Sequence, residues 1–157
     1  MDPLTIGDAR WEFLKQITFK SGEIVVCDPQ VKTDGFVYRN LQTKTWDAWV
    51  LKQHEDVWGW RNARLVLTLP GERPIYEYKE GKKTHTINVD SGQAGFFDCY
   101  ELEEAVIGDE IAKIPGICVT SGLGDGCYEL WSTFFPPFTI QTRQFTLVFL
   151  EEAPIKL

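Results

Sequence analysis

The sequence predicts a mainly β fold, a single-domain β-sandwich or barrel-like sheet with one or two short helices, over residues 1–157. Short apolar runs rich in β-branched and aromatic residues recur along the chain, and turn residues separate them. Almost no segment has the spacing of an amphipathic helix, and no linker or low-complexity tract divides the chain. A chain of 157 residues is also long enough for one domain with one core.

Each predicted strand is bounded by turn residues. The first follows the Ser21-Gly22 turn and ends before Asp28-Pro29, whereas Pro70-Gly71 stops the RLVLTL run. In the last strand apolar residues recur with a period of two, at Phe145, Leu147 and Phe149. In chain order the predicted strands are Glu23–Cys27, Phe36–Tyr38, Trp46–Leu51, Arg64–Leu69, Ile75–Tyr78, Thr84–Val89, Ile117–Thr120, Tyr128–Thr133 and Phe138–Leu150.

Three other local structures are predicted. Glu80–Lys83, with a glycine at its second position, is typical of a hairpin tip. Asp8–Ile17 has apolar residues on one side at helical spacing and Asp8 as a candidate N-cap, so we expect a helix. Glu101–Ile114 has similar spacing but contains Gly108, which indicates a short helix or a helix and turn.

Composition and charge narrow the classes of function. The formal net charge is −7, and a protein that binds a phosphate backbone or an anionic membrane surface needs a cationic face, so we expect neither partner. The N-terminal residues lack the pattern of a signal peptide, and no apolar run is long enough to span a bilayer. We therefore expect a cytoplasmic protein.

The four cysteines are interpreted as reduced thiols that pack as small apolar side chains: Cys27, Cys99, Cys118 and Cys127. Zinc sites usually draw their ligands from closely spaced cysteine pairs, and the chain contains no C-x-x-C. No phosphate-binding, dinucleotide-binding, zinc-protease or EF-hand motif occurs, and no motif places His54 or His85 beside a nucleophile. We expect no metal and no cofactor.

One motif occurs twice. Val89–Leu102 reads VDSGQAGFFDCYEL and Val119–Leu130 reads VTSGLGDGCYEL, so each copy has V-x-S-G, a glycine-containing spacer and C-Y-E-L. We expect each V-x-S-G to form a strand end and a tight glycine turn, and the two turns to be neighbours in space. The C-Y-E-L segment is predicted to lead into the helix in the first copy and into a strand in the second, which argues against a true duplication.

Carboxylates near these turns form a candidate site. Gathered together, Asp90, Asp98 and Asp125 would form an acid–base pair or hold a hard cation. Gln93 would then position a substrate, and glycine amides would line an anion site. The alternative, which we favour, is that each aspartate caps its own turn, because Asp is a preferred turn residue.

The tryptophans form a second candidate site. Trp58 and Trp60 would lie on the same face of a strand, where an exposed pair would make a protein-binding patch. Core and rim packing is the more common use of large aromatic residues in a small β-domain.

Four segments in order carry a resemblance: SGEIVVCDP (21–29), ARLVL (63–67), VDSGQAGFFD (89–98) and SGLGDGCY (121–128). They resemble a set of mainly bacterial small proteins of unknown function with the pattern G-x-I-x-x-x-D-P … V-D-S/A-G … F-x-D … G-x-G-D-G-x-Y. The residues from 32 to 60 have no counterpart in that pattern. The resemblance implies no established activity, and it implies a link with bacterial toxin–immunity and interaction systems.

Two hypotheses follow for the function. The first is a non-enzymatic protein-binding module that neutralises or scaffolds a basic partner such as a toxin, as an immunity protein does. The second is a small enzyme or ligand-binding protein that uses the aspartate cluster in a glycine-lined pocket. Acidic charge, aromatic residues and the lack of a catalytic motif favour the first. The residues predict no particular oligomeric state.

Overall fold

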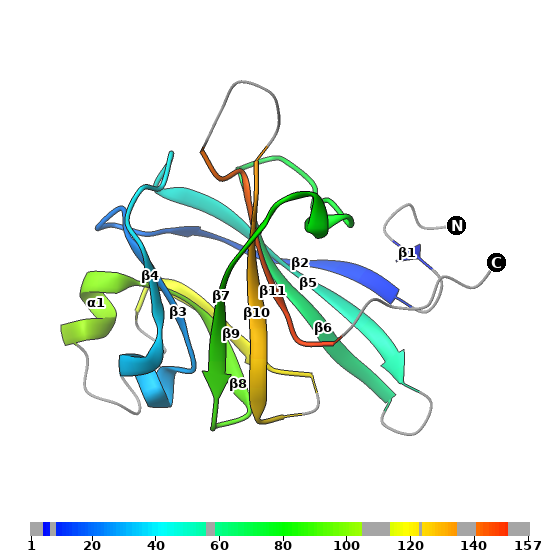
Figure 1. The fold of residues 1–157 in the computed structure, drawn as a ribbon. Helices are drawn as coiled ribbons and strands as arrows, with labels where there is room; N and C mark the ends of the chain where they lie inside the picture. Colours follow the sequence, from blue (N-terminus) through cyan, green and yellow to red (C-terminus); the bar gives the residue numbers. More distant parts are fainter. Residues whose placement is uncertain are drawn as a thin grey trace.

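The protein is a β-sandwich, as predicted, in which two antiparallel sheets pack face to face (Figure 1). The computed structural model describes residues 5–6, 9–55, 59–104, 114–122, 124–134 and 141–150. Among these residues, no helix is long and apolar enough to cross a membrane.

The larger sheet has seven strands in the order β1-β2-β5-β6-β11-β10-β7, and the smaller has four in the order β4-β3-β8-β9. The strands of the larger sheet are β1 (Thr5–Ile6), β2 (Ala9–Thr18), β5 (Thr45–Glu55), β6 (Gly59–Thr68), β7 (Lys82–Val89), β10 (Gly126–Thr133) and β11 (Gln144–Val148). Those of the smaller sheet are β3 (Ile24–Cys27), β4 (Phe36–Tyr38), β8 (Gln93–Asp98) and β9 (Gly116–Thr120). The helical elements are η1 (Pro29–Asp34), η2 (Tyr78–Glu80) and α1 (Cys99–Glu104).

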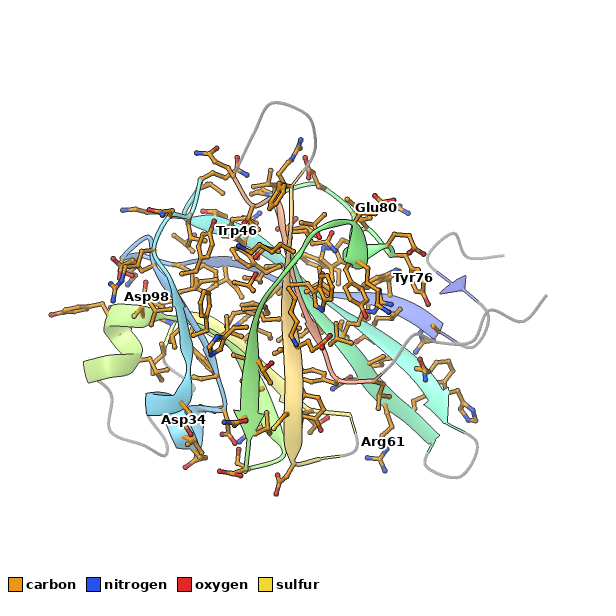
Figure 2. The ribbon with its side chains drawn as sticks, viewed as in Figure 1. Asp34, Trp46, Arg61, Tyr76, Glu80 and Asp98 are labelled. Atoms are coloured by element: carbon orange, nitrogen blue, oxygen red, sulfur yellow. The ribbon has the colours of Figure 1, made fainter. Side chains whose placement is uncertain are left out.

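The main core lies between the sheets. Alternation along β6 sends Leu65 and Leu67 into this core, where they meet Val26 and Phe96 of the smaller sheet. Trp46 of β5 is fully buried in the same cluster (Figure 2). Burial of each such side chain stabilises the fold by about 2 kcal/mol, so this interface accounts for the pairing of the two sheets.

The other face of the larger sheet carries a smaller cluster, which includes Trp11, Leu51 and Val66. Arg64 is also buried and stacks on two tyrosines, with its guanidinium carbon 4.3 Å from the ring centroid of Tyr76 and 4.4 Å from that of Tyr78. Its Nη1 donates a hydrogen bond to the Tyr76 carbonyl oxygen at 2.6 Å. Cation–π stacking thus holds the segment that contains Tyr76 and Tyr78 against the face of the larger sheet that carries the smaller cluster.

The predicted helix at Asp8–Ile17 is wrong, because the described part of this segment is strand β2 paired with β5. A bulge at Leu14, between Phe13 and Lys15, adds one residue and changes which face the following residues occupy. Trp11 therefore packs on the smaller cluster while Ile17 enters the main core. The inserted residue produces the three-residue apolar spacing that indicated a helix.

The predicted strand Ile75–Tyr78 and the hairpin tip Glu80–Lys83 are also wrong. Residues 74–77 are outside regular structure and η2 follows them. The tyrosines that suggested a strand pack on Arg64 instead of entering a sheet. Gly81 lies against β10, where a Cβ atom would clash with the Ser132 carbonyl oxygen. The chain therefore enters β7 through a close contact with β10 and not through a hairpin turn.

The other predicted strands are confirmed within a few residues, β5 and β6 being longer than expected. The helix predicted at Glu101–Ile114 corresponds in part to α1; residues 105–113 lie outside the described residues and Ile114 is in a bend. The strand predicted at Phe138–Leu150 is confirmed only over β11. Residues 138–140 lie outside the described residues, and residues 141–143 and 149–150 are not in a strand.

The cysteines are all free thiols. Cys27 and Cys99 are buried as expected, in a cluster below α1, and Cys118 is partly buried. The expectation is wrong for Cys127, which is exposed on β10, where its thiol donates to the Asn88 Oδ1 at 3.0 Å.

Candidate functional site

The two glycine turns of the repeated motif lie side by side, as predicted, at the lower edge of the molecule in Figure 1. The Ser121 backbone N–H donates to the Gly92 carbonyl oxygen at 3.0 Å, and Gly126 pairs with Val89. Gly92 and Gly122 have φ angles of 72° and 59°, a conformation that favours glycine. The following C-Y-E-L segments enter α1 and β10, which confirms their different structures.

The organising side chain of this corner is Asp28, which is fully buried. Its Oδ2 accepts from the backbone N–H groups of Asp90 at 2.7 Å and Ser91 at 2.6 Å. Its Oδ1 accepts from the Ser91 hydroxyl at 2.6 Å and the Gln30 backbone N–H at 2.9 Å. Burial opposes ionisation, but these hydrogen bonds outweigh it and lower the pKa of Asp28. Asp28 is therefore ionised, and its carboxylate holds the first turn in place through these hydrogen bonds.

Asp98 does not join the other two predicted carboxylates. It lies at the opposite end of β8 from Gln93, about 16 Å away at the usual strand rise, beside α1 in Figure 2. Its buried carboxylate accepts from the backbone N–H of Ser21 at 2.8 Å and of Glu101 at 3.1 Å. Asp98 thus caps α1, and the three-carboxylate site is not formed.

Asp90 and Asp125 are exposed, each in one of the two adjacent turns. A Cβ atom built on Gly92 would lie 3.9 Å from the Asp125 Oδ1, so this carboxylate faces the first turn. Burial, together with the negative charge of Asp125, raises the pKa of Tyr128, whose hydroxyl donates to the Gly124 carbonyl oxygen at 2.5 Å. Among the described residues, no group of three or more His, Cys, Asp or Glu could hold a metal ion.

Gln93 has a structural contact. Its Oε1 accepts a hydrogen bond from the Cys118 thiol at a sulfur–oxygen distance of 3.4 Å. Burial, helped by the charge of Asp28, raises the pKa of Cys118 to about 12, so the thiol stays protonated and keeps this donor at neutral pH. The substrate-positioning role that the sequence suggested for Gln93 has no support in this contact.

Trp60 is half exposed, with 50% of its surface accessible. The Arg10 guanidinium carbon lies 5.3 Å from its ring centroid, and the His54 ring packs edge-on at 5.3 Å. Two residues along β6, Asn62 donates through Nδ2 to the carbonyl and hydroxyl oxygens of Thr120, both at 3.0 Å. Trp60 therefore lies on the face of the larger sheet that meets the smaller sheet. Trp58, its predicted partner, lies outside the described residues.

The β6–turn surface comprises Trp60, Asn62 and Thr120, together with Asp90 and Asp125, which are exposed in the two adjacent turns. Thr120 connects its two halves because it contacts Asn62 on one side and precedes the second turn on the other. Trp60 supplies an apolar anchor at one end, and two exposed carboxylates supply negative charge at the other.

Two important residues were missed by sequence reasoning, Asp28 and Asn62. The sequence around Asp28 indicates its role, since an aspartate that follows a buried strand and precedes a proline is well placed to accept hydrogen bonds from neighbouring backbone amides. The sequence holds no such indication for Asn62, because its role depends on the packing of β6 against β9.

Comparisons with protein-family models, curated proteins and solved structures give no match for this chain. The resemblance to a set of mainly bacterial proteins therefore stays a prediction.

Proposed function

We propose that this protein is a non-enzymatic binding module that recognises another protein through the β6–turn surface. The observation that carries the proposal is the half-exposed Trp60 ring, which Arg10 and His54 hold in place. Tryptophan is among the residues that contribute most to protein interfaces, because it buries a large area and loses little conformational entropy.

The charge of the surface favours a basic partner. Asp90 and Asp125 are exposed at its far end, and the whole chain has a net charge of −7. Complementary charge raises the rate of encounter and excludes partners of the same sign. A cationic protein such as a nuclease-type toxin, which this module would neutralise or scaffold, has the required chemistry.

The alternative enzyme has weaker support. It requires three converging carboxylates, and Asp98 is at the far end of β8 with its oxygens bonded to two backbone amides. Asp90 and Asp125 lie in adjacent turns and are both exposed, so they do not line an enclosed site that would hold a substrate away from water.

The test is a pull-down from the native host with tagged wild type, Trp60→Ala and Phe13→Ala. Phe13 is a matched control, because it is also 50% exposed on the larger sheet but lies on the opposite face, edge-on to Trp49 at 5.3 Å. We expect a stoichiometric basic partner with wild type and Phe13→Ala, and its loss with Trp60→Ala. Equal recovery with all three proteins, or no stoichiometric partner, would contradict the proposal.

A further inference from the structure

A cleft of about 350 Å³ opens between the two sheets, where the edge strand β4 of the smaller sheet approaches the first residues of edge strand β7. Its walls come from segments far apart in the sequence: β4, β7, the end of β10 and the residues before β11. The volume is at the lower end of the range for small-molecule sites, which fits a molecule of one or two rings.

Three aromatic rings form the apolar wall of the cleft: Phe36, Tyr38 and Phe134. Two of them are held from behind, since Phe36 stacks on His85 at 5.0 Å and Tyr38 packs edge-on to Phe145 at 4.9 Å. Phe134 is 37% exposed at the rim. An exposed phenylalanine beside two partly buried rings leaves apolar surface that a planar ligand would cover.

Hydroxyl groups and one cation form the polar wall. The Thr84 and Ser132 hydroxyl oxygens are 2.8 Å apart, and those of Tyr38 and Thr142 are 3.1 Å apart. Lys82 is opposite Ser132 in the β7–β10 pairing. The close contact of Gly81 with the Ser132 carbonyl oxygen fixes the backbone there and so positions Lys82 at the cleft.

The neighbouring lysine shows a different arrangement. Lys83 forms an ion pair with Glu129 at 3.1 Å, whereas no carboxylate among the described residues pairs with Lys82. An ammonium group beside two hydroxyls is a site for an anionic group: when Thr84 donates to Ser132, the Ser132 hydroxyl hydrogen is left for the anion.

We propose that this cleft binds a small organic anion that carries an aromatic ring. The ring packs among Phe36, Tyr38 and Phe134, and the anionic group contacts Lys82 and the Ser132 hydroxyl. This site is separate from the β6–turn surface. The cleft lies at the start of β7 and the end of β10, whereas Asp90 and Asp125 lie at the opposite ends of these strands, and β11 and β10 separate β7 from β6. The proposal therefore stands whether or not a protein partner exists.

The test is an NMR titration of the ¹⁵N-labelled full chain with naphthoate and, separately, with its neutral amide, naphthamide. Naphthoate should shift the amide signals of Lys82, Thr84 and Ser132 and bind about tenfold more tightly than naphthamide, a difference that corresponds to about 1.4 kcal/mol. Two variants test the contributions of the polar wall and the apolar wall separately. Lys82→Gln should bring the naphthoate affinity down to that of the amide, and Phe134→Ala should weaken both probes.

Lys83→Gln is the matched control, since it removes the adjacent charge that is already paired, and it should leave both affinities unchanged. Equal affinity for the two probes would overturn the anion preference. Shifts centred on Trp60 or Phe13, or no binding at millimolar concentration, would overturn the site itself.

Discussion

Four aspartates beside the glycine turns and the ends of β3 and β8 divide into two pairs with opposite environments. Asp28 and Asp98 are fully buried and accept hydrogen bonds from backbone amides. Asp90 and Asp125 are exposed at the turn tips. The buried pair holds the fold together, and the exposed pair gives the β6–turn surface its charge. One residue type at similar sequence positions thus serves two purposes, and burial decides which.

The largest expected effect comes from Asp28→Asn. The new amide group would place a donor where the carboxylate now accepts from the Asp90 and Ser91 amides or from the Ser91 hydroxyl. Hydrogen bonds to a charged group contribute roughly 1.5–3 kcal/mol each, so we expect the free energy of unfolding to fall by about 3 kcal/mol. Urea denaturation at neutral pH measures this change. If the free energy of unfolding falls by less than about 0.5 kcal/mol, as expected for an exposed aspartate, Asp28 does not stabilise the fold as proposed.

A smaller loss is expected for Asp98→Asn, about 1–2 kcal/mol. Asparagine is a good N-cap, so its Oδ1 can keep the contact with the Glu101 amide while the contact with Ser21 is lost. Asp98→Ala removes both contacts and should cost more than Asp98→Asn in the same urea experiment. An equal cost for the two variants would mean that capping of α1 contributes nothing.

Acid should reveal the role of Asp28 in the wild type. Because the folded-state pKa of Asp28 is lowered, its contribution is present above its ordinary unfolded-state value of 3.8 and is lost as the pH falls through the lower folded value. Wild type should therefore lose more stability than Asp28→Asn between neutral pH and acid, and the two unfolding curves should approach each other. Parallel pH profiles would show that Asp28 gains nothing from ionisation.

The smallest effect on stability is expected for the exposed pair. Asp90→Asn and Asp125→Asn should each change the free energy of unfolding by less than about 0.5 kcal/mol, as is usual for exposed positions. The Asp90 backbone N–H still donates to Asp28 in the variant, because the substitution changes only the side chain. Thermal unfolding of both variants beside wild type provides the measurement. A loss comparable to that of Asp28→Asn would remove the distinction between the pairs.

Much of the fold could be predicted from the sequence, because most of the apolar runs bounded by turn residues are strands. Ile75–Tyr78 is an exception that is not a strand, and β8 was not predicted. The contact between the two glycine turns was also predictable from the repeated V-x-S-G. The bulge at Leu14 could not be predicted, since an inserted residue imitates helical spacing. The cation–π packing of Arg64 could not be predicted either. Because Tyr76 and Tyr78 stack on Arg64, the segment that was expected to be a strand covers the face of the larger sheet instead.

The candidate site was less predictable than the fold. All three aspartates lie near the two glycine turns in the sequence, and only the distance along β8 separates Asp98 from the others. Exposure of Trp60 follows from how far the smaller sheet covers β6, which is a property of tertiary packing.

We propose that the exposed pair contributes to binding of a basic partner and that the fold does not need it. The most direct measurement is partner recovery by wild type and by the double variant Asp90→Asn with Asp125→Asn, at low and at high ionic strength. We expect the double variant to recover several-fold less partner at low ionic strength, and the difference to disappear at high ionic strength, where surface charges are screened. Equal recovery by the two proteins at low ionic strength would contradict the claim.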